Sequence, residues 1–173
     1  MTIDTTLPGA PLLDQGAFRR TMGRFPSFVT VITTGTAGGP AGCTATAVLS
    51  LSLSPASVLV SLRSESRTLR EIRASGAFAV NALAWEQRAL AQRFATGDPE
   101  RRFDGVSHSW TDGVPVLDDC SATVVCRLRD TVEALDHTLL IGTAERAEHA
   151  PDAPMVLLDG QAHRLAPADF PAL

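Results

Sequence analysis

The sequence contains no lysine and no tyrosine, so arginine supplies all 15 of its permanently positive side chains. These absences exclude mechanisms that depend on a Schiff-base lysine, a phosphate-loop lysine or a catalytic tyrosine. Two glycine signatures are missing as well. Without G-x-G-x-x-G there is no Rossmann dinucleotide fingerprint, and without G-x-S-x-G there is no nucleophile elbow.

Cysteine is scarce and its spacing does not suggest a metal or redox motif. The three cysteines, Cys43, Cys120 and Cys126, form no C-x-x-C pair. Cys120 and Cys126 would lie about 20 Å apart along a strand, too far for a disulfide. The four histidines share no ligand spacing, so no metal site is predicted. Buried free thiols in a reducing cytosol are the expected state.

The charge and hydropathy of the chain exclude further classes of protein. The net charge of -4 provides no electrostatic footprint for nucleic acid. No stretch approaches the roughly 18 apolar residues of a membrane-spanning helix. Residues 1–13 carry neither the basic nor the apolar region of a signal peptide. We therefore expect a cytoplasmic protein that binds neither nucleic acid nor membrane.

The length and the 45% hydrophobic content suit one globular domain. We predict a flexible arm over 1–13, a single domain over 14–168 and a tail over 169–173. Strands rich in β-branched or alternating residues are predicted at 27–34, 43–54, 58–63, 78–83, 119–129, 138–147 and 155–158. Short helices are predicted after Asp14 and over 66–75 and 85–95, with a turn at 35–42 and irregular chain over 97–118. This pattern predicts a mainly β fold, a closed or nearly closed barrel.

A run of small and hydroxyl residues is the first candidate site. Gly42 to Ala47 lets another group approach the backbone closely, and its N–H groups could donate to a flat heterocycle. In a regular strand, Thr44, Thr46, Ser50 and Ser52 would share one face and could bind ribityl or phosphate oxygens. A polar strand face that only meets water explains the same pattern.

Two further constellations could carry chemistry. Arg63 to Thr68 precedes a helix for which Ser66 is a plausible N-cap, so amides, hydroxyls and arginines could hold an anion. Ordinary capping beside surface arginines is the alternative. Asp136 and His137 form the third constellation, because a carboxylate beside a histidine can tune its proton affinity. A structural histidine at a turn is the alternative there.

Taken in order, these segments resemble the short-chain flavin reductases, the reductase components of two-component flavin-dependent monooxygenases. The similarity to the 4-hydroxyphenylacetate monooxygenase reductases covers about residues 17–165. It is carried by F-R-R-T-M-G-R-F at 18–25, V-T-V-I-T-T at 29–34, G-C-T-A-T-A-V at 42–48, Ser66-x-Thr68, S-G-x-F-x-V-N-x-L at 75–83, Phe94-Ala95, Arg102-Phe103 and Asp136-His137.

The resemblance implies an FMN-binding split β-barrel, a Greek-key six-stranded barrel with short inserted helices, assembled as a homodimer. It implies hydride transfer from NADH or NADPH to FMN or FAD, and a separate monooxygenase that receives the reduced flavin. His137 would lie near the nicotinamide as the catalytic candidate. The implied cofactor-binding residues are Thr44, Ala45, Thr46, Ala47, Ser50, Ser61, Leu62, Arg63, Ser66, Thr68, Phe94, Ala95 and Arg102.

The chain departs from the family pattern at two positions. Leu135 replaces the glycine that precedes Asp136-His137, and His163 stands where relatives often carry an aromatic residue. These departures keep open a flavin- or haem-binding sensor or storage protein without nicotinamide turnover. A pyridoxamine-phosphate-type oxidase is less favoured, because its basic substrate-phosphate residues are not seen. Arg63, Arg67 or Arg102 could favour the 2′-phosphate of NADPH, or could be surface charges.

Overall fold

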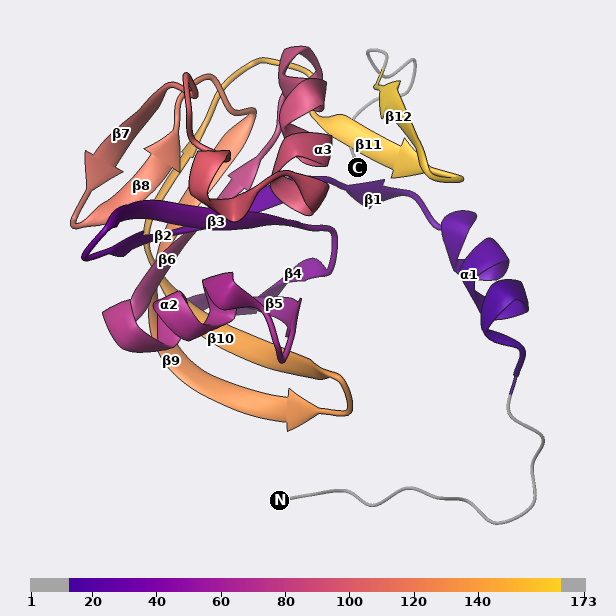
Figure 1. The fold of residues 1–173 in the computed structure, drawn as a ribbon, viewed down its shortest axis with the longest axis horizontal. Helices are drawn as coiled ribbons and strands as arrows, with labels where there is room; N and C mark the ends of the chain where they lie inside the picture. Colours follow the sequence, from indigo (N-terminus) through magenta and orange to yellow (C-terminus); the bar gives the residue numbers. More distant parts are fainter. Residues whose placement is uncertain (1–12, 166–173) are drawn as a thin grey trace.

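The structure of the chain is a computed structural model that describes residues 13–165 (Figure 1). The predicted arm, apart from its last residue, and the predicted tail lie outside these residues. The fold is mainly β, as predicted. Its main sheet has seven antiparallel strands in the order β3-β2-β6-β9-β10-β5-β4. These strands are β2 (Thr30–Thr36), β3 (Gly39–Ala45), β4 (Val48–Leu53), β5 (Ala56–Arg63), β6 (Ala77–Ala82), β9 (Ala122–Ala134) and β10 (His137–His149).

One bent segment explains why the main sheet has seven strands, whereas the resemblance implied a six-stranded barrel. The segment predicted as a single strand over 43–54 breaks at Thr46 and Ala47 into β3 and β4. β3 pairs with β2 at one edge of the sheet, and β4 pairs with β5 at the other edge. The Ser61 N–H also donates to the Ala47 carbonyl at 2.9 Å. The two edges are therefore joined by a bend in the chain, which makes the barrel a split one.

Two smaller sheets flank the barrel. β1 (Ser27–Phe28), β11 (Met155–Leu158) and β12 (Gln161–Arg164) form one sheet, and β7 (His108–Thr111) pairs with β8 (Val114–Leu117) in a hairpin. β7 and β8 lie within 97–118, so the prediction of irregular chain there was wrong. The predicted turn over 35–42 was also too long, because β3 begins at Gly39. The predicted strand over 119–129 instead runs from Ala122 to Ala134.

The β7–β8 hairpin is attached to the barrel by buried polar contacts. The side-chain amide of Asn81 donates to the Val31 carbonyl at 2.9 Å, and its oxygen accepts from the Leu117 N–H at 2.9 Å. Gly35 permits the close approach, because a Cβ there would lie 2.2 Å from the Gly113 carbonyl oxygen. The hairpin is therefore held firmly beside β2 and β3.

Three helices follow the predicted positions. In α1 (Gln15–Gly23) the Asp14 carboxylate accepts from the Ala17 N–H, and in α2 (Arg67–Ser75) Ser66 is the N-cap and Gly76 the left-handed C-cap. A 3₁₀ turn, η1 (Trp85–Gln87), leads into α3 (Arg88–Thr96), and η2 (Pro99–Arg101) follows. α1 stands apart from the barrel at the right of Figure 1, and none of its residues is buried.

The hydrophobic core has two main parts. Inside the barrel, α2 packs Leu69 and Ile72 against Ile32, Phe78 and Leu140, all of them fully buried. The second part lies beneath α3 and is built from seven buried residues: Val29, Val31, Leu83, Phe94, Leu117, Cys120 and Met155. Burial of these side chains fixes α2 and α3 on the barrel, and both helices border the cavity described next.

Candidate functional site

One cavity of about 720 Å³ lies between the β3–β4 bend, β5, α2 and α3. Its volume is within the range of small-molecule sites. The catalytic candidate and all of the implied cofactor-binding residues line it, with Ser50 as the exception. The lining residues are Cys43, Thr44, Ala45, Thr46, Ala47, Ser61, Leu62, Arg63, Glu65, Ser66, Arg67, Thr68, Phe94, Ala95, Pro99, Arg102 and His137.

Ser50 lies outside the cavity because of the bend. The expectation that Thr44, Thr46, Ser50 and Ser52 share one face required a regular strand through all four positions. The chain leaves the strand at Thr46 and Ala47, so the alternation is broken there. Thr44 and Thr46 line the cavity, whereas Ser50 and Ser52 lie on β4 beyond its rim.

The bend lines the cavity and carries backbone donors that no strand pairing uses. Thr46 and Ala47 are exposed, belong to no strand, and donate their N–H groups to no other backbone group of residues 13–165. The hydroxyl of Thr44 has a structural partner, because it donates to the Ala91 carbonyl at 2.7 Å and so joins β3 to α3. The groups available to a ligand here are therefore amides of the bend and the Thr46 side chain.

The N-terminus of α2 forms the opposite part of the cavity. The Ser66 hydroxyl accepts from the Leu69 N–H at 3.4 Å, as an N-cap does. Thr68 is buried with only 3% of its surface exposed. The first N–H groups of a helix attract anions, and the neighbouring Arg63 adds positive charge. This part of the cavity has the chemistry of a phosphate site.

Arg102 is held by backbone carbonyls at the same end. Its Nε donates to the Gly97 carbonyl at 3.1 Å and its Nη1 to the Gly42 carbonyl at 2.8 Å. Gly42 allows this packing, since a Cβ there would lie 2.8 Å from the Ile32 carbonyl oxygen and 3.3 Å from the Phe94 ring. The guanidinium therefore has a fixed position and retains further N–H groups for an anion.

His137 begins β10 and lies directly across from Arg63 of β5, on the lining of the cavity. Its Nδ1 lies 2.8 Å from the Asp136 carboxylate, and the His137 and Asp136 side chains are 41% and 86% exposed. The hydrogen bond and charge of His137 lower the pKa of Asp136 below its usual value. Leu135, in the family's glycine position, adopts a left-handed φ of 59° and is 99% exposed. The turn that carries His137 is thus formed without glycine.

Four lining residues were not proposed as flavin contacts. Cys43, Glu65 and Arg67 belong to motifs singled out in the sequence, whereas Pro99 gave no signal. Burial raises the pKa of the Cys43 thiol, and hydrogen bonds with Thr68 and Ser66 act in the opposite direction. The other departure from the family pattern, His163, is exposed on β12 and does not line the cavity.

The two ends of the cavity differ in chemistry, and together they suit a flavin nucleotide. Helix amides, hydroxyls and arginine at the α2 end can hold a phosphate. At the other end, Ala45, Ala47 and Leu62 leave room for a flat ring, and the backbone donors of the bend can bond to its polar edge. No lysine or tyrosine is needed for either task.

Comparison with known proteins agrees with this chemistry. The model of the flavin reductase like domain matches residues 22–166. The chain is 38% identical over 138 residues to NADH:riboflavin 5′-phosphate oxidoreductase of Streptomyces pristinaespiralis, covering 79% of this chain and 78% of that protein. It is 34% identical over 156 residues to the reductase subunit HsaB of a flavin-dependent monooxygenase of Rhodococcus jostii, covering 88% and 78%.

A longer relative and a solved structure extend the comparison. The chain matches the "Probable flavin reductase" of Rhizobium meliloti with 36% identity, and spans only 46% of the length of that relative. NADH:FAD oxidoreductase SgcE6 of Streptomyces globisporus, solved in complex with NAD and FAD fragments, superposes with a TM-score of 0.85 at 31% identity. That match covers 93% of this chain and 100% of the other. Within residues 13–165, no helix has the length and apolar character needed to span a membrane.

Proposed function

Because the chain belongs to the flavin reductase like domain family, we propose that it is an NAD(P)H-dependent reductase that transfers hydride to FMN or FAD. One observation carries this proposal: a single cavity gathers the small residues of the β3–β4 bend, the α2 N-terminus and His137. The names of the relatives favour NADH as the hydride donor. They also favour turnover over the sensor or storage alternative.

When bound, flavin and nicotinamide would supply the redox chemistry, a hydride transfer between the two rings. The chain has to position two rings and limit their access to water. The N–H groups of Thr46 and Ala47 would hold the polar edge of the flavin ring, and Ser61 and Leu62 would border it from β5. Donors placed at this edge favour the extra negative charge that a ring gains on reduction.

The flavin phosphate is assigned to the α2 N-terminus. Ser66 and Thr68 surround it with hydroxyls, and Phe94 and Ala95 close that end from α3. Arg102, fixed by the Gly97 and Gly42 carbonyls, supplies a permanent charge. Ser66 already accepts a helix N–H, so its hydroxyl proton is the group it offers to the phosphate.

His137 is proposed to face the nicotinamide. The imidazole lines the cavity at the start of β10 and shares a hydrogen bond with the exposed Asp136. Asp136 selects the ring orientation in which Nε2 is directed away from the carboxylate. In this proposal His137 would position the reacting ring from the start of β10, and Asp136 acts through His137.

The reduced flavin is proposed to serve a separate flavin-dependent monooxygenase, as the name of the Rhodococcus jostii relative indicates for that protein. The chain is further proposed to act as a homodimer. Three leucines on the edge strand β4 support this, because Leu49, Leu51 and Leu53 are 49%, 43% and 90% exposed. An exposed apolar edge strand is a common pairing surface.

A cytoplasmic location is also proposed. All three cysteines are free; Cys120 and Cys126 are buried, and Cys43 is half-buried. Burial raises the pKa values of Cys120 and Cys126 to about 12. Free thiols of this kind are usual in a reducing compartment.

The activity is tested by following the oxidation of NADH and of NADPH with the purified chain and added FMN or FAD. We expect oxidation that depends on both chain and flavin, and faster turnover with NADH than with NADPH. Anaerobic spectra should show bleaching of the flavin. Stoichiometric flavin or haem binding without NADH-dependent bleaching would instead establish the sensor or storage alternative.

A further inference from the structure

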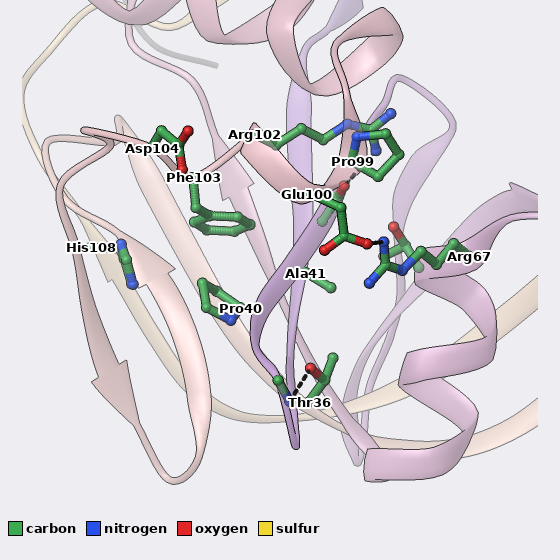
Figure 2. A pocket seen from close by; sticks show the side chains of 13 residues that line it. Thr36, Pro40, Ala41, Arg67, Pro99, Glu100, Arg102, Phe103, Asp104 and His108 are labelled. Carbon is green, nitrogen blue, oxygen red and sulfur yellow. Dashed lines mark hydrogen bonds and ion pairs between the residues drawn. The ribbon is translucent and has the colours of Figure 1, made fainter.

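One of the arginines at the phosphate end of the cavity already has an anionic partner. Arg67 is the first residue of α2 and lines the flavin cavity, and its guanidinium forms an ion pair with the Glu100 carboxylate of η2. Figure 2 shows the two side chains directed at one another from their separate elements. Glu100 itself does not line the flavin cavity. The ion pair therefore occupies a cation that a bound phosphate would need.

The segment that carries Glu100 is fixed by its neighbours and not by the ion pair. The Nη1 of Arg102 donates to the Gly42 carbonyl of β3 at 2.8 Å. The Nη2 of Arg93, on α3, donates to the Arg101 carbonyl at 2.8 Å. These bonds hold η2 against β3 and α3 on both sides of the chain. Glu100 therefore stays beside the phosphate end when its partner turns away, and it behaves as a fixed anion.

A phosphate can take Arg67 from this partner. The Arg67 and Glu100 side chains are 42% and 72% exposed, and exposed ion pairs contribute little to stability. A guanidinium binds a phosphate through charge-assisted, often paired hydrogen bonds, which are among the stronger ones. Glu100 is also the main cause of the raised pKa of Arg67, so it is the anion with which Arg67 interacts most strongly in the unliganded chain. Exchange of the carboxylate for a phosphate is thus favourable, but it is not free of cost.

From this arrangement we infer that Glu100 competes with the flavin phosphate for Arg67 and so lowers the affinity of the chain for flavin nucleotides. The inference rests on the proposed function for the place of the phosphate at the α2 N-terminus. A reductase that serves a separate enzyme has to release its reduced flavin. A competitor at the phosphate favours release and leaves the ring end of the cavity unchanged.

The inference is tested with the dissociation constants of FMN and of riboflavin, which lacks the phosphate. Fluorescence titration measures both for the native chain, Glu100→Gln, Arg67→Gln and the double variant. Glu100→Gln removes the charge and keeps the size of the side chain. Glu65→Gln is the matched control, because Glu65 lines the flavin cavity and forms no ion pair within residues 13–165.

For Glu100→Gln we expect FMN to bind about 2- to 5-fold more tightly, the scale of one exposed ion pair, with riboflavin binding unchanged. Arg67→Gln should weaken FMN binding, and most of the gain from Glu100→Gln should disappear in that background, because the competition requires the arginine. The gain should also shrink in about 1 M salt, where the Debye length is about 3 Å. Glu65→Gln should change the FMN constant equally in both backgrounds.

Unchanged or weaker FMN binding in Glu100→Gln, or an equal gain for riboflavin, would overturn the inference. A gain that is just as large in the Arg67→Gln background would also overturn it, because Glu100 would then repel the phosphate without acting through Arg67. The binding constants require no turnover. NADH oxidation by the native chain with added FMN tests the proposed function separately, so the two failures are distinguishable.

Discussion

At the scale of single residues, Leu135 is the position at which backbone conformation and residue type disagree. Its φ of 59° is in the left-handed region, and its side chain is 99% exposed in the turn between β9 and β10. A left-handed conformation costs an L-residue with a side chain roughly 1–2 kcal/mol, and glycine avoids this cost. Because the side chain is exposed, little packing offsets the strain.

We therefore expect Leu135→Gly to raise the free energy of unfolding by about 0.5–1 kcal/mol, after allowing for the greater entropy of glycine in the unfolded chain. Denaturant unfolding followed by circular dichroism measures the change. The matched control is Ala134→Gly in the same hairpin, where φ is not positive. It should lower the stability by a similar amount, and stabilisation by both changes would refute the explanation.

At the scale of elements, the sequence predicted the ends of α2 correctly, because helix capping depends on residues that are close together in the chain. Ser66, the N-cap of α2, and Gly76, its C-terminal glycine, occupy the positions expected of them. Ser50 was misplaced because the bend at Thr46 and Ala47 has no proline or glycine to mark it. Pairing of the two halves with different strands, β2 and β5, causes the bend.

The N-terminus of α2 carries a prediction about the phosphate. Replacing both Ser66 and Thr68 with alanine should weaken FMN binding by about tenfold or more while riboflavin binding changes little, because a charge-assisted hydrogen bond contributes roughly 1.5–3 kcal/mol. Isothermal titration with both ligands measures the difference. Equal losses for FMN and riboflavin would place the phosphate elsewhere.

A control separates this effect from damage to the helix. Loss of the Ser66 cap alone destabilises a helix by about 1 kcal/mol, and asparagine is as good an N-cap as serine. Ser66→Asn should therefore keep the stability of the native chain. If Ser66→Ala weakens FMN binding only in proportion to a loss of thermal stability, the hydroxyl serves the helix and not the phosphate.

At the scale of the whole molecule, β4 is an edge strand with an apolar outer row. Leu51 and Leu53 are 43% and 90% exposed at the end of the main sheet. We expect Leu51→Arg combined with Leu53→Arg to raise the dissociation constant of the proposed dimer by about 100-fold or more, which corresponds to roughly 2.7 kcal/mol. Each arginine would place a charge in an apolar interface.

Sedimentation equilibrium of the purified chain measures this change. Leu165→Arg is the control, since Leu165 is an exposed leucine after β12 that lies outside β4. It should leave the association unchanged. A wild-type chain that sediments as a monomer at micromolar concentration, or equal dissociation in both variants, would show that β4 is not the dimer surface.

The sequence by itself determined the class of fold, and it predicted most of the residues that line the cavity. Helix caps and strand patterns depend on residues that are close together in the chain. The absence of lysine and tyrosine is a property of the composition alone. Only the tertiary structure decided where the barrel splits, that Ser50 lies outside the cavity, and that Arg67 forms an ion pair with Glu100. Arg67 and Glu100 are 33 positions apart. Strand pairing and burial set these features, and no local pattern records them.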